Sequence, residues 1–154
     1  MNRGTNYFGT TVFLDSDLSL AGKSFEPIGI DSKYFNGTFD GQGYVISNLA
    51  MNFSLQYVGL FGYSRGHTIK NVVIDYSCSF ASSFTGNNNV RVGGIIGHCY
   101  AENGPCAIEN SVNMGSVTFD GNTAGNYGFS FFGGIAGRLS SYKYDITVKN
   151  CANN

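Results

Sequence analysis

Apolar residues occur along this chain in short runs that end at Gly or Asn. Every window that places apolar residues at i, i+3, i+4 and i+7 is also interrupted by Gly or Asn, so no helix is predicted. The 154 residues include 22 Gly and 17 Asn, and both residue types tolerate the positive φ of tight turns. The pattern therefore predicts an all-β protein built from many short strands.

Two motifs repeat along the chain. The first is an apolar strand closed by Gly-x-x-Gly, at 57–62, 92–97 and 132–137. The second is apolar-x-Asn, at 69–71, 108–110 and 148–150, with 46–48 interpreted as an earlier relative. The second motif recurs after 39 and 40 residues. Because the Trp-Asp signature of propeller blades is missing, this period predicts a β-solenoid whose coils stack parallel strands.

Stacked coils would place equivalent residues over one another at about 4.8 Å. We expect the repeated apolar positions to form the core, where each buried side chain contributes about 1.5 to 3 kcal/mol. The two predicted core columns are Leu60, Ile95 and Ile135, and Ile69, Ile108 and Val148. The repeated Gly positions would serve corners, or sites where a Cβ would collide with the next coil.

Polar positions beside these columns predict the register of the stack. We expect a ladder of side-chain amides, each donating to one neighbour and accepting from the other, formed by Asn71, Asn110 and Asn150. The preceding position alternates in sign, as Lys70, Glu109 and Lys149. In-register coils would bring these opposite charges together, at about 0.2 to 1 kcal/mol per exposed contact.

These motifs resemble the GLUG repeat family, named for a Gly-Leu-x-Gly core that occurs here at 59–62. The resemblance extends upstream through 13–20, 25–29 and 35–49, which look like the segment that opens such arrays. It is weakest at 76–90 and 118–130, which we interpret as variable loops. The resemblance implies a right-handed parallel β-helix with inserted loops. It also implies a secreted or surface protein, adhesin-like or lying beside the catalytic part of a bacterial immunoglobulin-cleaving metalloprotease.

We interpret 1–154 as a single β-solenoid domain. An opening segment, 1–56, precedes repeats at 57–89, 90–130 and 131–154. The last repeat stops four residues after its Asn, whereas the preceding one continues. An unfinished coil exposes unpaired N–H and C=O groups. We therefore expect a longer array or a covered end.

Charge and hydropathy exclude two classes of partner. Nine basic and ten acidic side chains give a formal charge of −1, and no segment concentrates the Lys and Arg that nucleic acid or an anionic membrane would require. No run approaches the roughly 18 apolar residues of a membrane span, and the first residues lack the apolar region of a secretory signal. We expect no nucleic-acid partner and no membrane insertion.

The four cysteines suggest disulfides. Cys99 and Cys106 flank a turn-rich loop, which favours a local pair and leaves Cys78 with Cys151. Three pairings remain open, because sequence alone does not select one. Zinc is the competing interpretation, but no Cys-x-x-Cys knuckle occurs and neither His has ligand spacing to a Cys. Oxidised, extracellular use is therefore favoured, with a free buried thiol as the alternative for Cys151.

Other candidate sites are surface features. Sequons at Asn36 and Asn52 make both candidates for glycosylation, although such triplets are common in an Asn-rich chain. Aromatic residues of the insertion loops could stack on sugars or on another subunit, or fold back over the flank of the helix. They are Tyr76, Phe80, Phe84, Tyr127, Phe129, Tyr142 and Tyr144.

The sequence predicts a non-enzymatic, extracellular or cell-surface protein with a structural or adhesive role. It would be a subunit or segment of a surface or fibrous assembly, stacking head-to-tail through open coil ends. The alternative is a carbohydrate- or protein-binding accessory module of a larger surface protein, such as a secreted protease. A carbohydrate-active enzyme would need paired carboxylates, but Asp40 lies in a turn with no second acid one coil away. No cofactor or metal is expected, and glycans are the candidate ligands.

Overall fold

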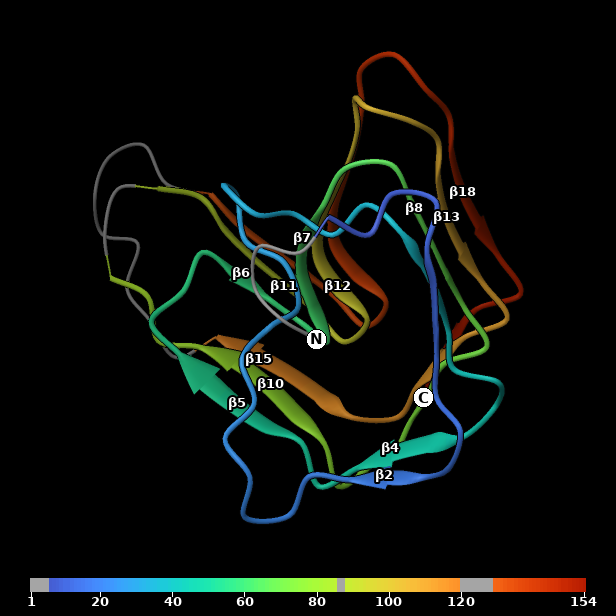
Figure 1. The fold of residues 1–154 in the computed structure, drawn as a ribbon. Helices are drawn as coiled ribbons and strands as arrows, with labels where there is room; N and C mark the ends of the chain where they lie inside the picture. The colour runs from blue at the N-terminus through green and yellow to red at the C-terminus, as the bar shows by residue number, and fades with distance from the viewer. Residues whose placement is uncertain (1–5, 86–87, 120–128) are drawn as a thin grey trace.

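The computed structural model describes residues 6–85, 88–119 and 129–154, and every regular element within those ranges is a β-strand. The strands form five parallel sheets, which the chain visits in the same order on each pass from β3 onward, whereas β1 and β2 join only the first two (Figure 1). The prediction of an all-β chain is confirmed. Within the same ranges, no helix is long and apolar enough to cross a membrane.

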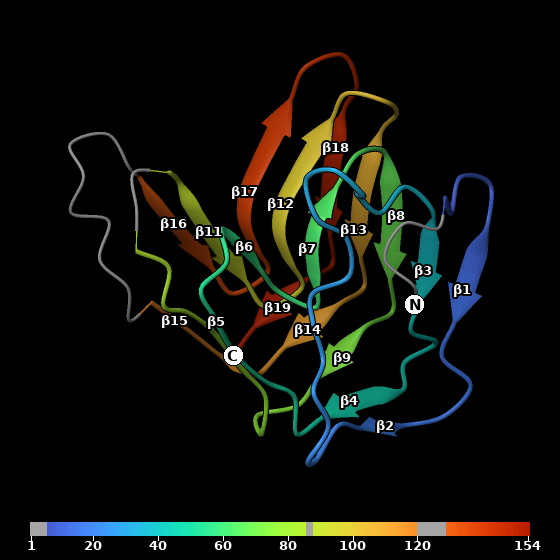
Figure 2. The same ribbon diagram turned by 60° about the vertical axis from the view of Figure 1, so that its left-hand side comes forward.

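Each sheet collects strands that are one pass apart in the sequence (Figure 2). The first sheet contains, in spatial order, β1 (Thr11–Phe13), β3 (Thr38–Asp40), β8 (His67–Lys70), β13 (Cys106–Glu109) and β18 (Ile146–Lys149). The second contains β2 (Leu18–Ser19), β4 (Val45–Ser47), β9 (Val73–Ile74), β14 (Val112–Asn113) and β19 (Ala152–Asn153).

The other three sheets each contain three strands. The third is β5 (Ala50–Phe53), β10 (Ser79–Ser82) and β15 (Ser116–Phe119). The fourth is β6 (Tyr57–Val58), β11 (Val90–Gly93) and β16 (Ser130–Gly133). The fifth is β7 (Phe61–Ser64), β12 (Ile96–Ala101) and β17 (Ala136–Ser141).

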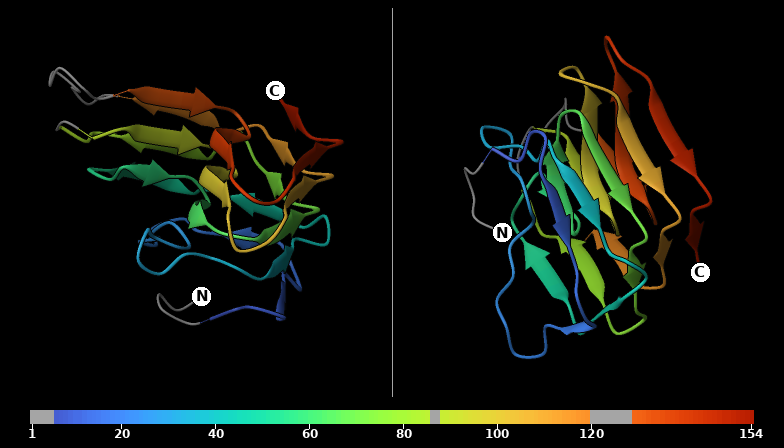
Figure 3. Two further views of the ribbon diagram at one scale, coloured as in Figure 1. Left: turned by 90° about the horizontal axis from the view of Figure 1, so that it is seen from above. Right: turned by 45° about the vertical axis from the view of Figure 1, so that its right-hand side comes forward.

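Successive passes lie over one another in register, with the N-terminal strands at one end and the C-terminal strands at the other (Figure 3). Ile108 pairs with Ile69 on one side and with Val148 on the other. The apolar columns point inward, and Leu60, Ile69, Ile95 and Ile108 belong to one continuous core. Residues that are one repeat apart in the sequence therefore lie beside one another on neighbouring passes.

Two residues of the predicted core columns are less buried than expected. Ile135 is half-buried and Val148 is 45% exposed, whereas Ile95 and Ile108 one pass earlier are fully buried. Both residues lie on the last pass, so in the described chain no further strand covers them. The inward pattern continues to the end of the stack, but burial does not.

The interpretation of Asn48 as a relative of Asn71 is wrong. Strand β4, which ends just before Asn48, pairs with β9, whereas Asn71 follows β8 in another sheet. Both asparagines adopt a positive φ, of 55° in each case. The common three-residue motif therefore marks a corner at which Asn has a left-handed backbone conformation. The two corners join different pairs of sheets.

The Gly columns lie where the fourth sheet turns into the fifth. A Cβ on Gly97 would lie 2.8 Å from the Gly62 carbonyl oxygen and 2.9 Å from the Val58 nitrogen, both on the neighbouring pass. Such contacts involve backbone atoms, which cannot rotate away. Close approach of two passes therefore requires glycine at this position.

Aromatic packing closes the N-terminal end of the stack. Residues 20–37 run across it and form isolated bridges that join Ile28 to Phe61 and Phe35 to Ser64. The Phe35 ring lies 4.9 Å from that of Phe61 and 5.6 Å from that of Tyr7, measured between centroids. Phe35 is buried, so the opening segment covers one end of the core.

We predict that Gly97→Ala destabilises the protein, because the added methyl group meets backbone atoms of the neighbouring pass. The expected loss is about 1 to 3 kcal/mol in the free energy of unfolding, measured by urea denaturation. Gly104→Ala is the control, since its Cβ would find its nearest neighbour at 3.6 Å, and we expect a change within about 0.5 kcal/mol. Equal losses for the two variants would contradict this account of the glycine column.

Candidate functional site

The last strand of each sheet contributes to one end of the molecule, which we call the terminal face, formed by β15 to β19. Its inward positions remain apolar, yet Phe132, Leu139 and Val148 are 45%, 42% and 45% exposed. Their register partners one pass earlier are Val92, Cys99 and Ile108, all fully buried. The terminal face therefore has the composition of an interior without a covering strand.

The Asn column lies at the corner between the first and second sheets. The amide of Asn150 donates to Oδ1 of Asn110 at 3.0 Å, and that of Asn110 donates to Oδ1 of Asn71 at 3.4 Å. All three residues have a positive φ, between 48° and 55°. Asn tolerates this conformation better than other non-glycine residues. The ladder and the corner thus favour the same residue type.

Charged residues continue the column beside the Asn ladder. Asp40, Lys70, Glu109 and Lys149 are register partners in that order, so the alternation of sign extends one pass further than the three positions identified in the sequence. Lys70 Nζ lies 3.3 Å from an oxygen of Asp40. Asp40 also accepts a hydrogen bond from Asn71 at 2.8 Å. These contacts lower the pKa of Asp40 against the opposing effect of burial.

A second pair of stacked asparagines was not predicted. Asn113 is buried, and its amide donates to Oδ1 of Asn153 at 3.0 Å and to the Gly115 carbonyl at 3.0 Å. A Cβ on Gly94 would collide with the Asn113 side chain. The repeated Gly therefore accommodates this buried amide. The 40-residue spacing of the two asparagines, which equals the repeat period, could have predicted this pair.

A buried polar cluster lies inside the stack where the fifth sheet meets the first. Its members are Ser64 at the end of β7, His67 on β8, Cys99 on β12 and Cys106 on β13. The register places Cys106 beside His67 and Cys99 beside Ser64, so two residues come from each of two successive passes. All four are at least 97% buried.

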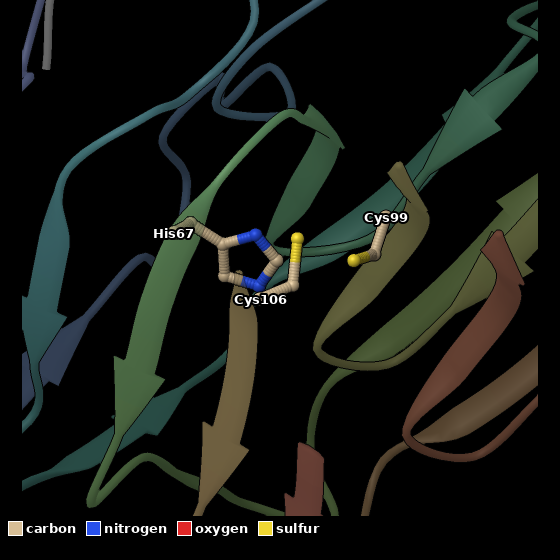
Figure 4. A group of neighbouring side chains, drawn as sticks. All are labelled: His67, Cys99 and Cys106. Carbon is tan, nitrogen blue, oxygen red and sulfur yellow. The ribbon is translucent and has the colours of Figure 1, made fainter. Parts of the chain in front are cut away.

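The atoms of this cluster are close enough to interact. Oγ of Ser64 lies 2.7 Å from Nδ1 of His67. A ring nitrogen of His67 and the sulfur atoms of Cys99 and Cys106 lie within 4.8 Å of one another, and Figure 4 shows these side chains facing the same space. The partner of Cys99 on the last pass is Leu139, and that of Cys106 is Ile146. On the side of the last pass, the cluster is therefore covered by apolar side chains.

Proximity of the two thiols shifts their pKa values in opposite directions. The neighbouring Cys99 thiol, with a smaller contribution from His67, lowers the pKa of Cys106. The Cys106 thiol together with burial raises the pKa of Cys99. The first thiol of the pair to ionise is therefore stabilised by the other.

The structure contains the four cysteines as free thiols. It brings Cys99 and Cys106 together, and their pairing as a disulfide stays a prediction. Sγ of Cys78 contacts the carbonyl of Ile46, and burial raises its pKa. Sγ of Cys151 contacts the carbonyl of Ile108. The pairing of Cys78 with Cys151 also stays a prediction.

The two sequons differ in their surroundings. Nδ2 of Asn36, the atom that would carry a glycan, donates a hydrogen bond to Asn6 at 2.7 Å. Its Oδ1 accepts from the Tyr7 backbone at 2.9 Å. Asn52 lies exposed on β5. Asn52 is the better acceptor site, and its glycosylation stays a prediction.

The predicted loop aromatics do not form one surface. Phe80 lies on β10 and is fully buried, so its expected place in a loop is wrong, since the insertion begins later. Phe84 packs partly buried against the core, and Tyr127 lies outside the described residues. The remaining ring side chains are exposed, namely Tyr76, Phe129, Tyr142 and Tyr144.

Arginines and aromatic rings interleave on the outer side of the corner between the fourth and fifth sheets. We call this group the arginine cluster, and it consists of Arg65, Arg91, Arg138, His98, Tyr57, Tyr63 and Tyr100. Register places Arg91 beside Tyr57 and His98 beside both Tyr63 and Arg138. The Arg91 guanidinium lies 5.1 Å from the centre of the Tyr57 ring.

Positive charge in this cluster is only partly balanced. Arg65 pairs with Glu102 at 2.9 Å and with Asp31 at 3.7 Å. Among the described residues, no carboxylate lies within ion-pair distance of Arg91 or Arg138. Arg91 is only 7% exposed and its Nε has no hydrogen-bond partner in the described chain. The cluster is therefore suited to an anionic group.

Comparisons with protein-family models, with curated proteins and with solved structures find no match.

Burial, together with Arg91, Arg138 and Arg65, lowers the pKa of His98 from 6.5 to about 3. Between those values the unfolded chain binds a proton that the folded chain does not. The free energy of unfolding is therefore unaffected by the titration of His98 well above pH 6.5, and it falls as the pH decreases from 6.5 toward 3. We predict that the wild type loses about 2 to 3 kcal/mol more than His98→Gln between pH 7 and 4.5, by urea denaturation. Identical losses would contradict this assignment.

Proposed function

We propose that the chain is a right-handed β-solenoid module with a structural or adhesive role, non-enzymatic and extracellular or at a cell surface. The repeating order of the five parallel sheets supports a solenoid. The right-handed coiling of the helix and the extracellular setting are what the GLUG-like motifs imply. The observation that carries the functional proposal is the terminal face, where Phe132, Leu139 and Val148 are exposed although their register partners on the preceding pass are fully buried.

A second copy of the chain is the partner that fits this face. All strands within the sheets are parallel, so a head-to-tail neighbour would present strands of the same direction. Among the described residues, β1 and β2 at one end and β18 and β19 at the other each pair with a strand on one side only. Val12, Phe39, Ile69, Ile108 and Val148 form one column, so Val12 of the next copy would extend it.

Head-to-tail contact of this kind propagates. Because the face that is covered differs from the face that covers it, each addition recreates the same open end. Unless the rotation closes a ring, the product is a filament. A further segment of a longer chain would cover the terminal face by the same contacts, so a fibrous or surface-array role follows from either occupant.

We predict that the protein self-associates and that a charge on the terminal face prevents it. Phe132→Asp and Val148→Asp would each bury an unpaired carboxylate at the contact, which is costly. Analytical ultracentrifugation should show assemblies of the wild type that grow with concentration, and monomers for both variants. Tyr44→Asp, on a side surface where β4 already has neighbours on both edges, should assemble as the wild type does. Monomeric wild type at high concentration would contradict the proposal.

Carbohydrate binding is the second candidate function, and the arginine cluster favours it. Tyrosine rings provide stacking surfaces, and unpaired guanidinium groups attract a carboxylate or sulfate. Acidic glycans are therefore the chemical class that matches this cluster. An accessory binding module of a larger surface protein would use this side surface and leave the terminal face for chain continuation.

We predict that acidic oligosaccharides bind and that Arg138→Ala weakens binding about tenfold or more, since a charge-assisted hydrogen bond is lost. Isothermal titration calorimetry would measure the affinity at two salt concentrations. Lys149→Ala removes an exposed charge of the first sheet and should change the affinity little. Equal affinity of all three proteins, or no binding of acidic glycans, would reject this second function.

A further inference from the structure

The buried cluster of Ser64, His67, Cys99 and Cys106 is not used by either proposed function. A ring nitrogen of His67 and the two sulfur atoms already lie within 4.8 Å of one another. In a tetrahedral site with Zn–S bonds of about 2.3 Å and Zn–N bonds of about 2.0 Å, the ligand atoms are about 3.6 to 3.8 Å apart. Movements of about 1 Å would therefore give these three atoms the spacing of a zinc site.

Hydrogen bonding around His67 matches that of a metal ligand. Its Nδ1 is held by the Ser64 hydroxyl at 2.7 Å, which fixes the ring. Its Nε2 is buried and has no hydrogen-bond partner among the described residues. Metal-binding histidines characteristically use one nitrogen for the metal and the other for such an orienting group. If His67 were only a packing residue of the interior, its buried Nε2 would be left without a hydrogen bond, which is costly.

Charge selects the kind of ion. Two cysteines bind metals as thiolates, which places two negative charges beside apolar side chains such as Leu139 and Ile146. A divalent cation makes this site neutral, whereas a monovalent cation leaves an uncompensated charge. Thiolate and imidazole ligands suit zinc, whereas calcium and magnesium require oxygen ligands.

We propose that His67, Cys99 and Cys106 bind one Zn²⁺ ion inside the stack, with a water molecule as the fourth ligand. Binding forms two Zn–S bonds and one Zn–N bond, and the two thiol protons leave to solvent. The ion joins β8 on one pass to β12 and β13 on the next. A disulfide between Cys99 and Cys106 would use the same two sulfur atoms, so the two states exclude each other.

Metal content tests the site directly. The full chain, produced with zinc under reducing, anaerobic conditions and then desalted, should contain one zinc per molecule by inductively coupled plasma mass spectrometry. Cys99→Ser and Cys106→Ser should lose it, while Cys78→Ser, which alters another buried thiol, and Cys151→Ser should retain it. Zinc-free wild type with free thiols, or retention of zinc in both cluster variants, would overturn the proposal.

Two further measurements keep the test decisive if a cluster variant fails to fold. Co²⁺ added to the reduced wild type should give thiolate-to-metal charge-transfer bands and the strong visible bands of a tetrahedral ion. A spectrum of octahedral Co²⁺ would overturn the proposal, as would a Cys99–Cys106 disulfide found by mass spectrometry in the zinc-supplied protein.

Ser64 acts as a positioning residue in this account. Ser64→Ala removes the group that orients His67, so we expect zinc affinity to fall about 10- to 100-fold in competition with a chromophoric chelator. Ser64→Thr retains the hydroxyl and should restore most of the affinity. Unchanged affinity in Ser64→Ala, with the fold intact by circular dichroism, would contradict the role assigned to the His67 ring.

Discussion

In-register stacking of parallel strands is the constraint on which the other features depend. Register gives each position a neighbour one pass away, 27 to 40 residues along the sequence, so each side chain must be compatible with those directly above and below it. Ile stacks on Ile, the amide of Asn110 bonds to Asn71, and opposite charges alternate along the adjoining column. The choice of residue is restricted further at the corners, because Gly97 has no room for a Cβ and Asn110 has a positive φ.

The two ends of the stack differ in how far their apolar side chains are covered. Residues 20–37 and the Phe35 ring cover the core at the N-terminal end, whereas Val148 and Phe132 are exposed at the other. These exposed apolar residues support the proposal of stacking with a second copy or with a further segment of a longer chain. The arginine cluster on the side surface would remain available to a ligand in such an assembly.

The repeat allowed the strands, the Asn71 ladder and the inward columns to be predicted, because spacing alone determines them. Motif similarity without register failed at Asn48, whose corner joins different sheets. The buried cluster was missed because His and Cys were compared by local spacing. His67 and Cys106 are separated by 39 residues, one repeat period, so the period itself contained the signal. The unbalanced charge of Arg91 depends on which side chains meet across a corner, and sequence spacing does not contain that information.

Backbone proximity between passes tests the central claim most directly. Nuclear Overhauser contacts measured on the isotope-labelled protein should connect Ile69 with Ile108 and Ile108 with Val148, in the pattern of parallel strands. Strands in a parallel sheet lie about 4.8 Å apart, within reach of this measurement. Contacts that instead join consecutive strands as antiparallel hairpins, with Ile69 remote from Ile108, would contradict the stacked arrangement and the sites that depend on it.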